Sequence, residues 1–166
     1  MKAALISIRP EWCAKIASGE KTIEVRKTRP KLETPFKCYI YCTLQGCNDF
    51  FRVYLGGDVA KWNHGKWADR KGKVVGEFIC DRIYELAPLN HAPDDVEKQA
   101  CLTREEIVSY LKGTGYGWHI SDLRIYDEAR ELSEFTGLRN TRFGAAPYDI
   151  KRAPQSWFYV EETDND

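Results

Sequence analysis

Five side chains near the N-terminus have the chemistry to bind an anionic, planar ligand. They are three cations, a carboxylate and an indole: Arg9, Lys21, Arg26, Glu24 and Trp12. Arginine and lysine bind phosphate, an indole ring stacks on a nucleobase, and a carboxylate accepts from base amino groups. These residue types in one stretch predict a pocket for a nucleotide or RNA. The alternative is a solvated strand face with ion pairs, which is common in proteins.

Residues 5–27 are expected to position these side chains as a strand, a short helix, a tight turn and a second strand. Pro10 suits the first position of a helix, where a backbone N–H has no partner to lose. Gly19 permits the left-handed backbone with which helices often end. Residues 22–26 then alternate polar and apolar, as in a half-buried strand with Glu24 and Arg26 on one face.

The stretch from Gly19 to Arg26 reads GEKTIEVR and matches the pattern G-x-K-x-x-E-x-R. With the segments 7–10, 74–78 and 153–160, this motif resembles the ASCH domain (activating-signal-cointegrator homology), a branch of the PUA-like proteins. The last segment, APQSWFYV, is similar to the closing strand of phage and prophage-type members. The resemblance covers roughly residues 3–161 and implies binding of RNA, a nucleotide or a modified nucleoside.

The resemblance also implies two further site residues. Glu77 aligns with a pocket carboxylate, and Trp157 is a candidate for stacking on a base beside Trp12. One similar branch removes the acyl group from N4-acetylcytidine with a lysine, a threonine nucleophile and a glutamate. Lys21 and Glu77 match two of these places, but Glu24 stands where the threonine is expected.

Two alternatives to a binding protein follow. The first is a hydrolase acting on a modified nucleoside or on RNA, with Lys21, Glu24 and Glu77 as catalytic residues. A carboxylate that activates water would then replace the nucleophilic hydroxyl. The second is a non-catalytic protein-interaction module, in which a Glu24–Arg26 or Glu77–Lys21 pair only holds the strand.

The expected fold class is α+β: a small, mostly antiparallel β-barrel with peripheral short helices, as in PUA-like proteins. About six strands are spread along the chain, and they do not alternate regularly with helices. The segment 73–84 is the clearest strand, with Val75 and Glu77 on one face and Gly76 allowing close approach of a backbone or ligand. Thr103 and Glu106 form a capping box that begins a helix.

Composition bounds the function. Lysine plus arginine and aspartate plus glutamate both number 25, so the formal net charge is zero. A neutral chain is not suited to coating long nucleic acid by charge alone. We expect one domain over residues 1–161, a disordered tail at 162–166, and a monomer. The N-terminus lacks a signal sequence and no apolar run is long enough to span a membrane, so a cytoplasmic location is expected.

No cofactor and no metal are expected. Cys38, Cys42 and Cys47 lack the spacing of zinc ligands and are interpreted as buried free thiols. His119 is interpreted first as a hydrogen-bonded structural residue. Two surface features are also predicted: an excursion at residues 58–72 with Trp62 and Trp67, and a loop with Arg139, Arg142 and Phe143 at the pocket mouth.

Overall fold

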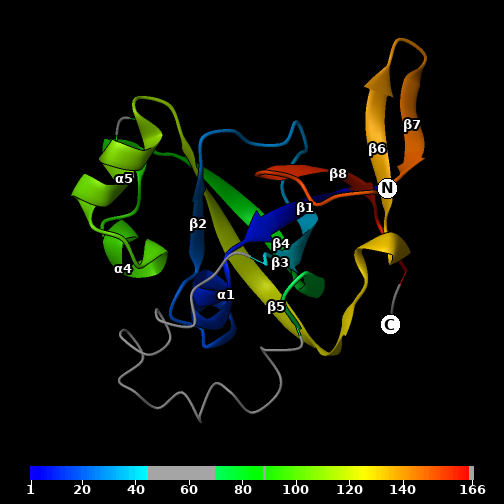
Figure 1. Ribbon diagram of the computed structural model, residues 1–166. Coiled ribbons are helices and arrows are strands. Elements are labelled where there is room, and N and C mark those ends of the chain that lie inside the picture. Colours follow the sequence, from blue (N-terminus) through cyan, green and yellow to red (C-terminus); the bar gives the residue numbers. More distant parts are fainter. Residues whose placement is uncertain (45–69, 88, 165–166) are drawn as a thin grey trace.

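The computed structural model describes residues 1–44, 70–87 and 89–164. Within them, eight strands form one sheet in the order β2-β5-β4-β3-β1-β8-β6-β7, with the helices α1, α4 and α5 on the side of β2 (Figure 1). The elements are β1 (Lys2–Ile8), α1 (Pro10–Ala17), β2 (Ile23–Arg26), β3 (Phe36–Cys42), β4 (Lys73–Glu85), η2 (Leu89–His91), α4 (Val96–Ala100), α5 (Arg104–Leu111), β5 (Tyr116–Arg130), η3 (Leu132–Glu134), β6 (Thr136–Thr141), β7 (Gly144–Asp149) and β8 (Trp157–Glu161).

The predicted α+β class with mostly antiparallel strands is confirmed. β1 and β3 pair in parallel, whereas the other pairs described are antiparallel. The prediction of about six strands was too low by the β6–β7 hairpin, which the sequence suggested was a loop. No helix in the described part of the chain is both long and apolar enough to cross a membrane.

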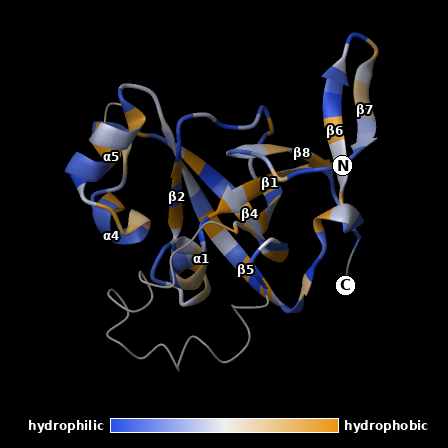
Figure 2. Cartoon of the chain, viewed as in Figure 1, coloured by the Kyte–Doolittle hydropathy of each residue, from blue (hydrophilic) through white to orange (hydrophobic). Residues whose placement is uncertain are grey.

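The core lies on both sides of the central strands, which are hydrophobic along most of their length (Figure 2). β1 illustrates this, because Ala4, Ile6 and Ile8 pack into one apolar cluster and Ala3 and Leu5 into another. Strand alternation sends successive side chains to opposite faces, so a strand buried on both faces needs a continuous apolar run. A third cluster fills the space between β2 and the helices α4 and α5.

A β-bulge in β4 decides where Glu77 lies. Ile40 of β3 pairs with Gly76 and Tyr41 pairs with Val74, so Val75 has no partner on β3. The extra residue breaks the alternation. Val75 enters the first apolar cluster, whereas Glu77 lies opposite Tyr39, which belongs to the second. The prediction that Val75 and Glu77 share a face is therefore wrong.

Gly76 lies where the backbones of β4 and β5 approach closely. A Cβ atom at this position would lie 2.5 Å from the carbonyl oxygen of Arg124 and 3.2 Å from the Cα of Ile125. The backbone must shift to admit it, so Gly76→Ala is expected to lower the free energy of unfolding by about 2 kcal/mol. Urea denaturation with an unchanged m-value measures this loss. A variant as stable as the parent protein would contradict the close approach.

The helix boundaries follow the predicted signals. Pro10 begins α1, and Gly19 follows it with a φ of +84°. The capping box at α5 is confirmed, because the hydroxyl of Thr103 accepts from the backbone N–H of Glu106 and the Glu106 carboxylate accepts from the N–H of Thr103.

The C-terminal segment stays attached to the sheet beyond the predicted boundary at residue 161. The N–H of Glu162 donates to the carbonyl of Met1 (2.7 Å), and the N–H of Thr163 donates to the hydroxyl of Tyr39 (2.9 Å). Both residues are therefore ordered, unlike the predicted tail. The predicted excursion with Trp62 and Trp67 lies outside the described residues, as does Cys47.

Candidate functional site

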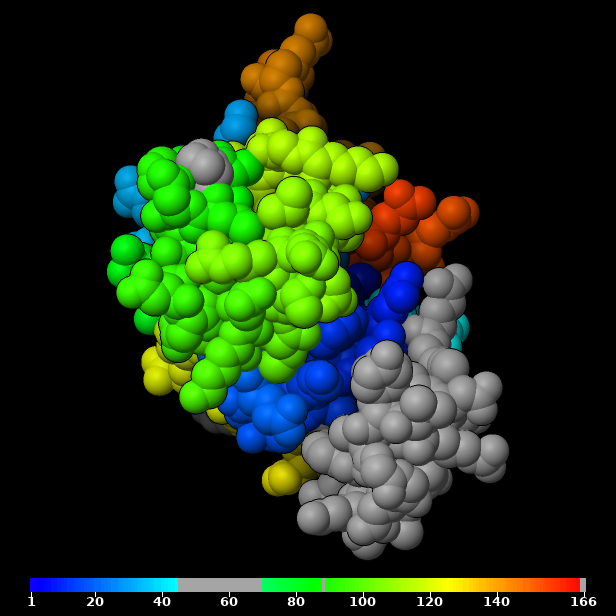
Figure 3. All heavy atoms as spheres, turned by 90° about the vertical axis from the view of Figure 1, so that its left-hand side faces the viewer, coloured from blue at the N-terminus to red at the C-terminus, as the bar shows by residue number. Residues whose placement is uncertain are grey.

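A cavity of about 800 Å³ lies between β2, the helix α5 and the segment 153–155 that precedes β8. Figure 3 shows the molecule hollowed between the yellow-green α5 region, the blue N-terminal segments and the red-orange C-terminal segment. This volume is in the range of cavities that bind small molecules.

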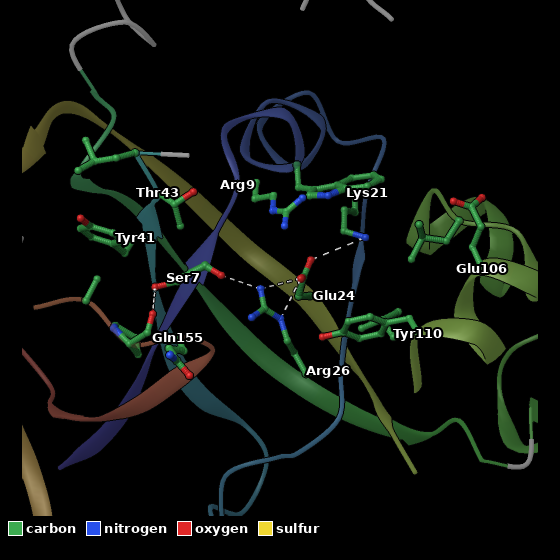
Figure 4. Close-up of a pocket in the computed structure, with 16 residues that line it drawn as sticks. Ser7, Arg9, Lys21, Glu24, Arg26, Tyr41, Thr43, Glu106, Tyr110 and Gln155 are labelled. Atoms are coloured by element: carbon green, nitrogen blue, oxygen red, sulfur yellow. Dashed lines mark hydrogen bonds and ion pairs between the residues drawn. The ribbon is translucent and has the colours of Figure 1, made fainter. Parts of the chain in front are cut away.

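Five of the seven predicted site residues line the cavity: Arg9, Trp12, Lys21, Glu24 and Arg26 (Figure 4). Ile23 and Val25 of β2 pack against α4 and α5, so strand alternation turns Glu24 and Arg26 the other way, toward β1 and the segment before β8. Lys21, Glu24 and Arg26 are only 3%, 6% and 9% exposed. The alternative of a solvated strand face is therefore wrong, since three charged groups so deeply buried need partners.

Arg26 ties the edge strand β2 to the centre of the sheet. Its Nη2 donates to the carbonyl of Ser7 on β1 (2.7 Å), and its Nη1 donates to the hydroxyl of Ser156 just before β8 (3.2 Å). Its Nε donates to Oε1 of Glu24 (3.0 Å). All three guanidinium nitrogens thus have protein acceptors. Arg26 positions Glu24 and connects β2 to β1 and to the segment before β8. Its N–H donors are therefore not free to bind a ligand phosphate, contrary to the prediction from the sequence.

Glu24 presents an acceptor to the cavity. Its Oε1 is held by Arg26, whereas its Oε2 lies 3.7 Å from Nζ of Lys21. Oε2 is buried and has no hydrogen-bond partner among the described residues. Buried polar atoms are nearly always hydrogen-bonded, so an atom of this kind in a cavity wall is suited to a ligand donor.

Lys21 is held in place by a backbone carbonyl and an aromatic ring. Its Nζ donates to the carbonyl of Ala100 and lies 4.8 Å from the centre of the Trp12 ring. Nζ of Lys15 lies 5.3 Å from the same ring. The Trp12 π-system therefore stabilises two ammonium groups, which compete with the base stacking predicted for it.

Burial lowers the pKa of Lys21 below its usual value of 10.5, and the charge of Glu24 partly offsets this effect. We expect the Lys21 ammonium to lose its proton at a lower pH than the exposed lysines do, when its side-chain resonances are followed by NMR. Glu24→Gln should lower the pKa of Lys21 further, because it removes the carboxylate that favours the charged form. A Lys21 pKa equal to that of the exposed lysines would contradict the burial.

The folded-state pKa of Lys21 lies below the unfolded value, so the unfolded chain binds more protons between the two. Stability therefore rises with pH in this window. Below the folded-state pKa, the cost of burying the charged ammonium is fully present.

Arg9 and two residues of α5 complete the cavity wall. The Arg9 side chain is exposed and makes no hydrogen bond or ion pair with the described residues, so its guanidinium is free for an anion. Tyr110 and Glu106, four residues apart on one face of α5, line the opposite wall. Tyr110 was not predicted as a site residue, and Glu106 was predicted only as part of the capping box. The sequence shows the helical spacing of these two residues, but it does not show that α5 docks beside β2.

Glu77 and Trp157 do not line this cavity, so the structure does not bring them together with the other five predicted site residues. Glu77 accepts a hydrogen bond from the hydroxyl of Tyr126 (2.6 Å) and lies 3.6 Å from Nζ of Lys37. Burial, and then Glu77, raise the pKa of Tyr126. The indole N–H of Trp157 donates to Thr28 (2.9 Å). The Glu77–Lys21 pair considered for a structural role is excluded as well.

The remaining candidates lie elsewhere. His119 is hydrogen-bonded to Asp81 (2.6 Å), as its structural interpretation requires. Arg139, Arg142 and Phe143 belong to the β6–β7 hairpin and do not line the cavity, so their prediction at its mouth was wrong.

Cys38 and Cys42 are buried free thiols, as predicted. Across residues 1–44, 70–87 and 89–164, no three side chains of the metal-binding types gather in one place.

The fold is similar to that of solved ASCH proteins. The crystal structure of ASCH from Zymomonas mobilis matches with a TM-score of 0.60 and 19% identity, over 96% of this chain and 88% of that chain. Two single-substitution variants of the Zymomonas mobilis protein match with TM-scores of 0.57 and 0.60 and identities of 18% and 19%. They cover 98% and 96% of this chain, and 92% and 89% of theirs.

At this identity the similarity establishes the ASCH fold, which the sequence motif predicted, and not an activity. It does not support the predicted likeness to phage-type members. No protein-family model matches the chain, and no curated protein matches it.

Proposed function

We propose that the cavity binds a nucleotide, free or within RNA, with the base edge against Glu24 and Lys21. The observation that carries this proposal is Oε2 of Glu24, a buried acceptor without a hydrogen-bond partner among the described residues. The Lys21 ammonium lies 3.7 Å from Oε2, too far for a hydrogen bond, and leaving a buried acceptor without a hydrogen bond costs about 1–3 kcal/mol. A ligand N–H that reaches it gains this energy back.

The pair of groups favours particular bases. Glu24 accepts and Lys21 donates, 3.7 Å apart. Adenine and cytosine each offer an amino donor beside a ring-nitrogen acceptor, which complements such a pair. Uracil has no exocyclic amino group and offers the carboxylate only its N3–H, which lies between two carbonyl oxygens. Tyr110 offers a half-exposed ring, with Nζ of Lys27 5.2 Å from its centre, so a base would stack on the face that Lys27 leaves open. Arg9 offers the free guanidinium for the phosphate.

Calorimetric titration with the 5′-monophosphates of adenosine, cytidine, guanosine and uridine tests the proposal. The adenosine and cytidine monophosphates should bind more tightly than the uridine monophosphate. Arg9→Ala should lower the affinity for these nucleotides about tenfold, a typical loss for one charge-assisted hydrogen bond. The affinity for the corresponding nucleosides should not change. Equal affinity for all four, or no binding at all, would contradict the assignment.

A hydrolase remains the second candidate, and one observation favours it. Lys21 has a lowered pKa and lies beside a carboxylate inside a cavity, an arrangement suited to general acid–base chemistry. Glu24 would activate water, because Glu77 is elsewhere and the Thr22 hydroxyl donates to Gln99 (3.1 Å) without lining the cavity. Incubation with N4-acetylcytidine or a short RNA, followed by mass spectrometry, distinguishes turnover from binding.

The third alternative, a protein-interaction module, is distinguished by the same titrations. It predicts that no nucleoside, nucleotide or RNA binds, while Glu24 and Arg26 still contribute to stability. The hydrogen bonds of Arg26 fit a structural role for this pair, but they leave Oε2 of Glu24 without a hydrogen-bond partner among the described residues.

A further inference from the structure

The hairpin of β6 and β7, residues 136–149, is an arm that leaves the body of the protein (Figure 1). β6 pairs with β8 only at Gly137, opposite Val160. Beyond this point the two strands pair only with each other, up to Thr141 and Gly144. A two-stranded ribbon without a third strand or a core is marginally stable on its own, so its exposed residues do not serve packing.

The arm and the segment after it carry positive charge in a chain whose net charge is zero. Residues 136–152 contain four cations and one carboxylate: Arg139, Arg142, Lys151, Arg152 and Asp149. All four cations are exposed and none forms an ion pair with the described residues. Such a cluster without carboxylate partners is complementary to a phosphate backbone.

Aromatic rings accompany the arginines. The Arg142 guanidinium lies 4.9 Å from the centre of the Phe143 ring, and that ring is 87% exposed at the tip of the arm. The Arg139 guanidinium lies 4.6 Å from the Tyr148 ring. Alternating cations and exposed rings bind single-stranded nucleic acid, because phosphates meet the cations while unpaired bases stack on the rings.

The chain connects the arm directly to the cavity. Lys151 and Arg152 follow β7, and the next three residues, Ala153 to Gln155, line the cavity wall. The Ser7 hydroxyl fixes this segment by donating to the carbonyl of Pro154 (2.7 Å). A strand with one nucleotide in the cavity would therefore pass the two exposed cations before it reached the arm.

We propose that the arm and the cations at 151–152 bind a single-stranded polynucleotide whose terminal or flipped-out nucleotide occupies the cavity. This inference rests on the proposed function for the identity of the ligand in the cavity, but the arm has its own contacts. It makes the preferred ligand a strand of several nucleotides rather than a mononucleotide. The shared chemistry is the phosphodiester backbone, and RNA and DNA are its two possible sources.

The test compares the double variant Arg139→Ala/Arg142→Ala with the parent protein. The probes are fluorescent RNA and DNA single strands of about twelve nucleotides, within the site sizes of such surfaces, and adenosine 5′-monophosphate. The variant should bind the better strand about tenfold more weakly and lower the slope of log Kd against log salt by about 1.4. Its affinity for the mononucleotide should not change.

Lys98→Ala/Arg104→Ala is the matched control. It removes two exposed cations from α4 and α5, on the other side of the molecule, and changes the net charge equally. Both double variants should keep the parent melting temperature. The proposal is supported if the arm variant, but not the control, binds the single-stranded probes more weakly. The probe with the higher affinity identifies the ligand as RNA or DNA.

Two results would overturn the proposal that the arm binds single strands. An equal loss in arm and control variants would mean that only net charge matters. Unchanged binding of the strands in the arm variant would mean that the arginines merely protect an exposed sheet edge. If the mononucleotide fails to bind while the arm variant weakens binding of the strands, the arm is supported and the cavity assignment fails.

Discussion

Replacement of Arg26 by methionine is expected to lower the free energy of unfolding by about 3–5 kcal/mol, as for other buried ion pairs that lose one partner. The substitution leaves the Glu24 carboxylate without its closest cation. It also leaves the carbonyl of Ser7 and the hydroxyl of Ser156 without their donors. Because these groups lie on β2, β1 and the start of β8, the edge of the sheet should loosen as well.

Chemical denaturation of Arg26→Met measures this loss, and Arg139→Met is its control. Arg139 is exposed on the arm, so its replacement should change stability by less than about 0.5 kcal/mol. Arg26→Lys should recover only part of the loss, since an ammonium cannot reproduce the planar fork that reaches three acceptors. If Arg26→Met were as stable as Arg139→Met, the hydrogen bonds of Arg26 to Glu24, Ser7 and Ser156 would contribute nothing to stability.

Replacement of Glu24 by glutamine is expected to lower the affinity for adenosine and cytidine monophosphates by about 10–100-fold. This corresponds to one hydrogen bond to a charged group, worth about 1.5–3 kcal/mol. The amide keeps the shape of the side chain but loses its charge. Its NH₂ group would also face the amino group of the base, so that two donors would oppose each other. Preference for amino-bearing bases over uracil should fall with it.

Glu77→Gln is the matched control for this experiment. Glu77 is also a strand glutamate near a lysine, although it is less buried than Glu24, and it contacts Tyr126 and Lys37 instead of the cavity. Its replacement should leave nucleotide affinity unchanged, contrary to what the sequence motif suggests. A ligand that is lost in Glu77→Gln and retained in Glu24→Gln would reverse the assignment of the two carboxylates.

Local signals predicted the part of the site that one continuous stretch supplies. The Pro10 start of α1, the Gly19 stop and the alternation of β2 are all set within residues 9–26. They bring Lys21 and Glu24 to the same wall without any long-range information. Their burial was not predictable, because it depends on distant segments: Lys21 donates to Ala100 of α4, and Glu24 is held by Arg26, which reaches β1 and the segment before β8.

Long-range features explain the predictions that failed. The bulge at Val75 depends on the pairing of β3 with β4, so alternation alone misplaced Glu77. The β6–β7 arm contains glycine, alanine, asparagine and proline, which have low strand propensity, and it forms a hairpin through pairing instead. Tyr110 reaches the cavity only because of tertiary packing.

An NMR titration of the ¹⁵N-labelled protein with adenosine and cytidine monophosphates tests the central claim most directly. The account predicts that the largest shift changes fall on the Trp12 indole, on the amides of Lys21 and Glu24, and on Tyr110 across the cavity. Saturating shifts at these residues would confirm that the cavity is the nucleotide site. Changes centred on Glu77 and Tyr126, or no change at any nucleotide concentration, would contradict it.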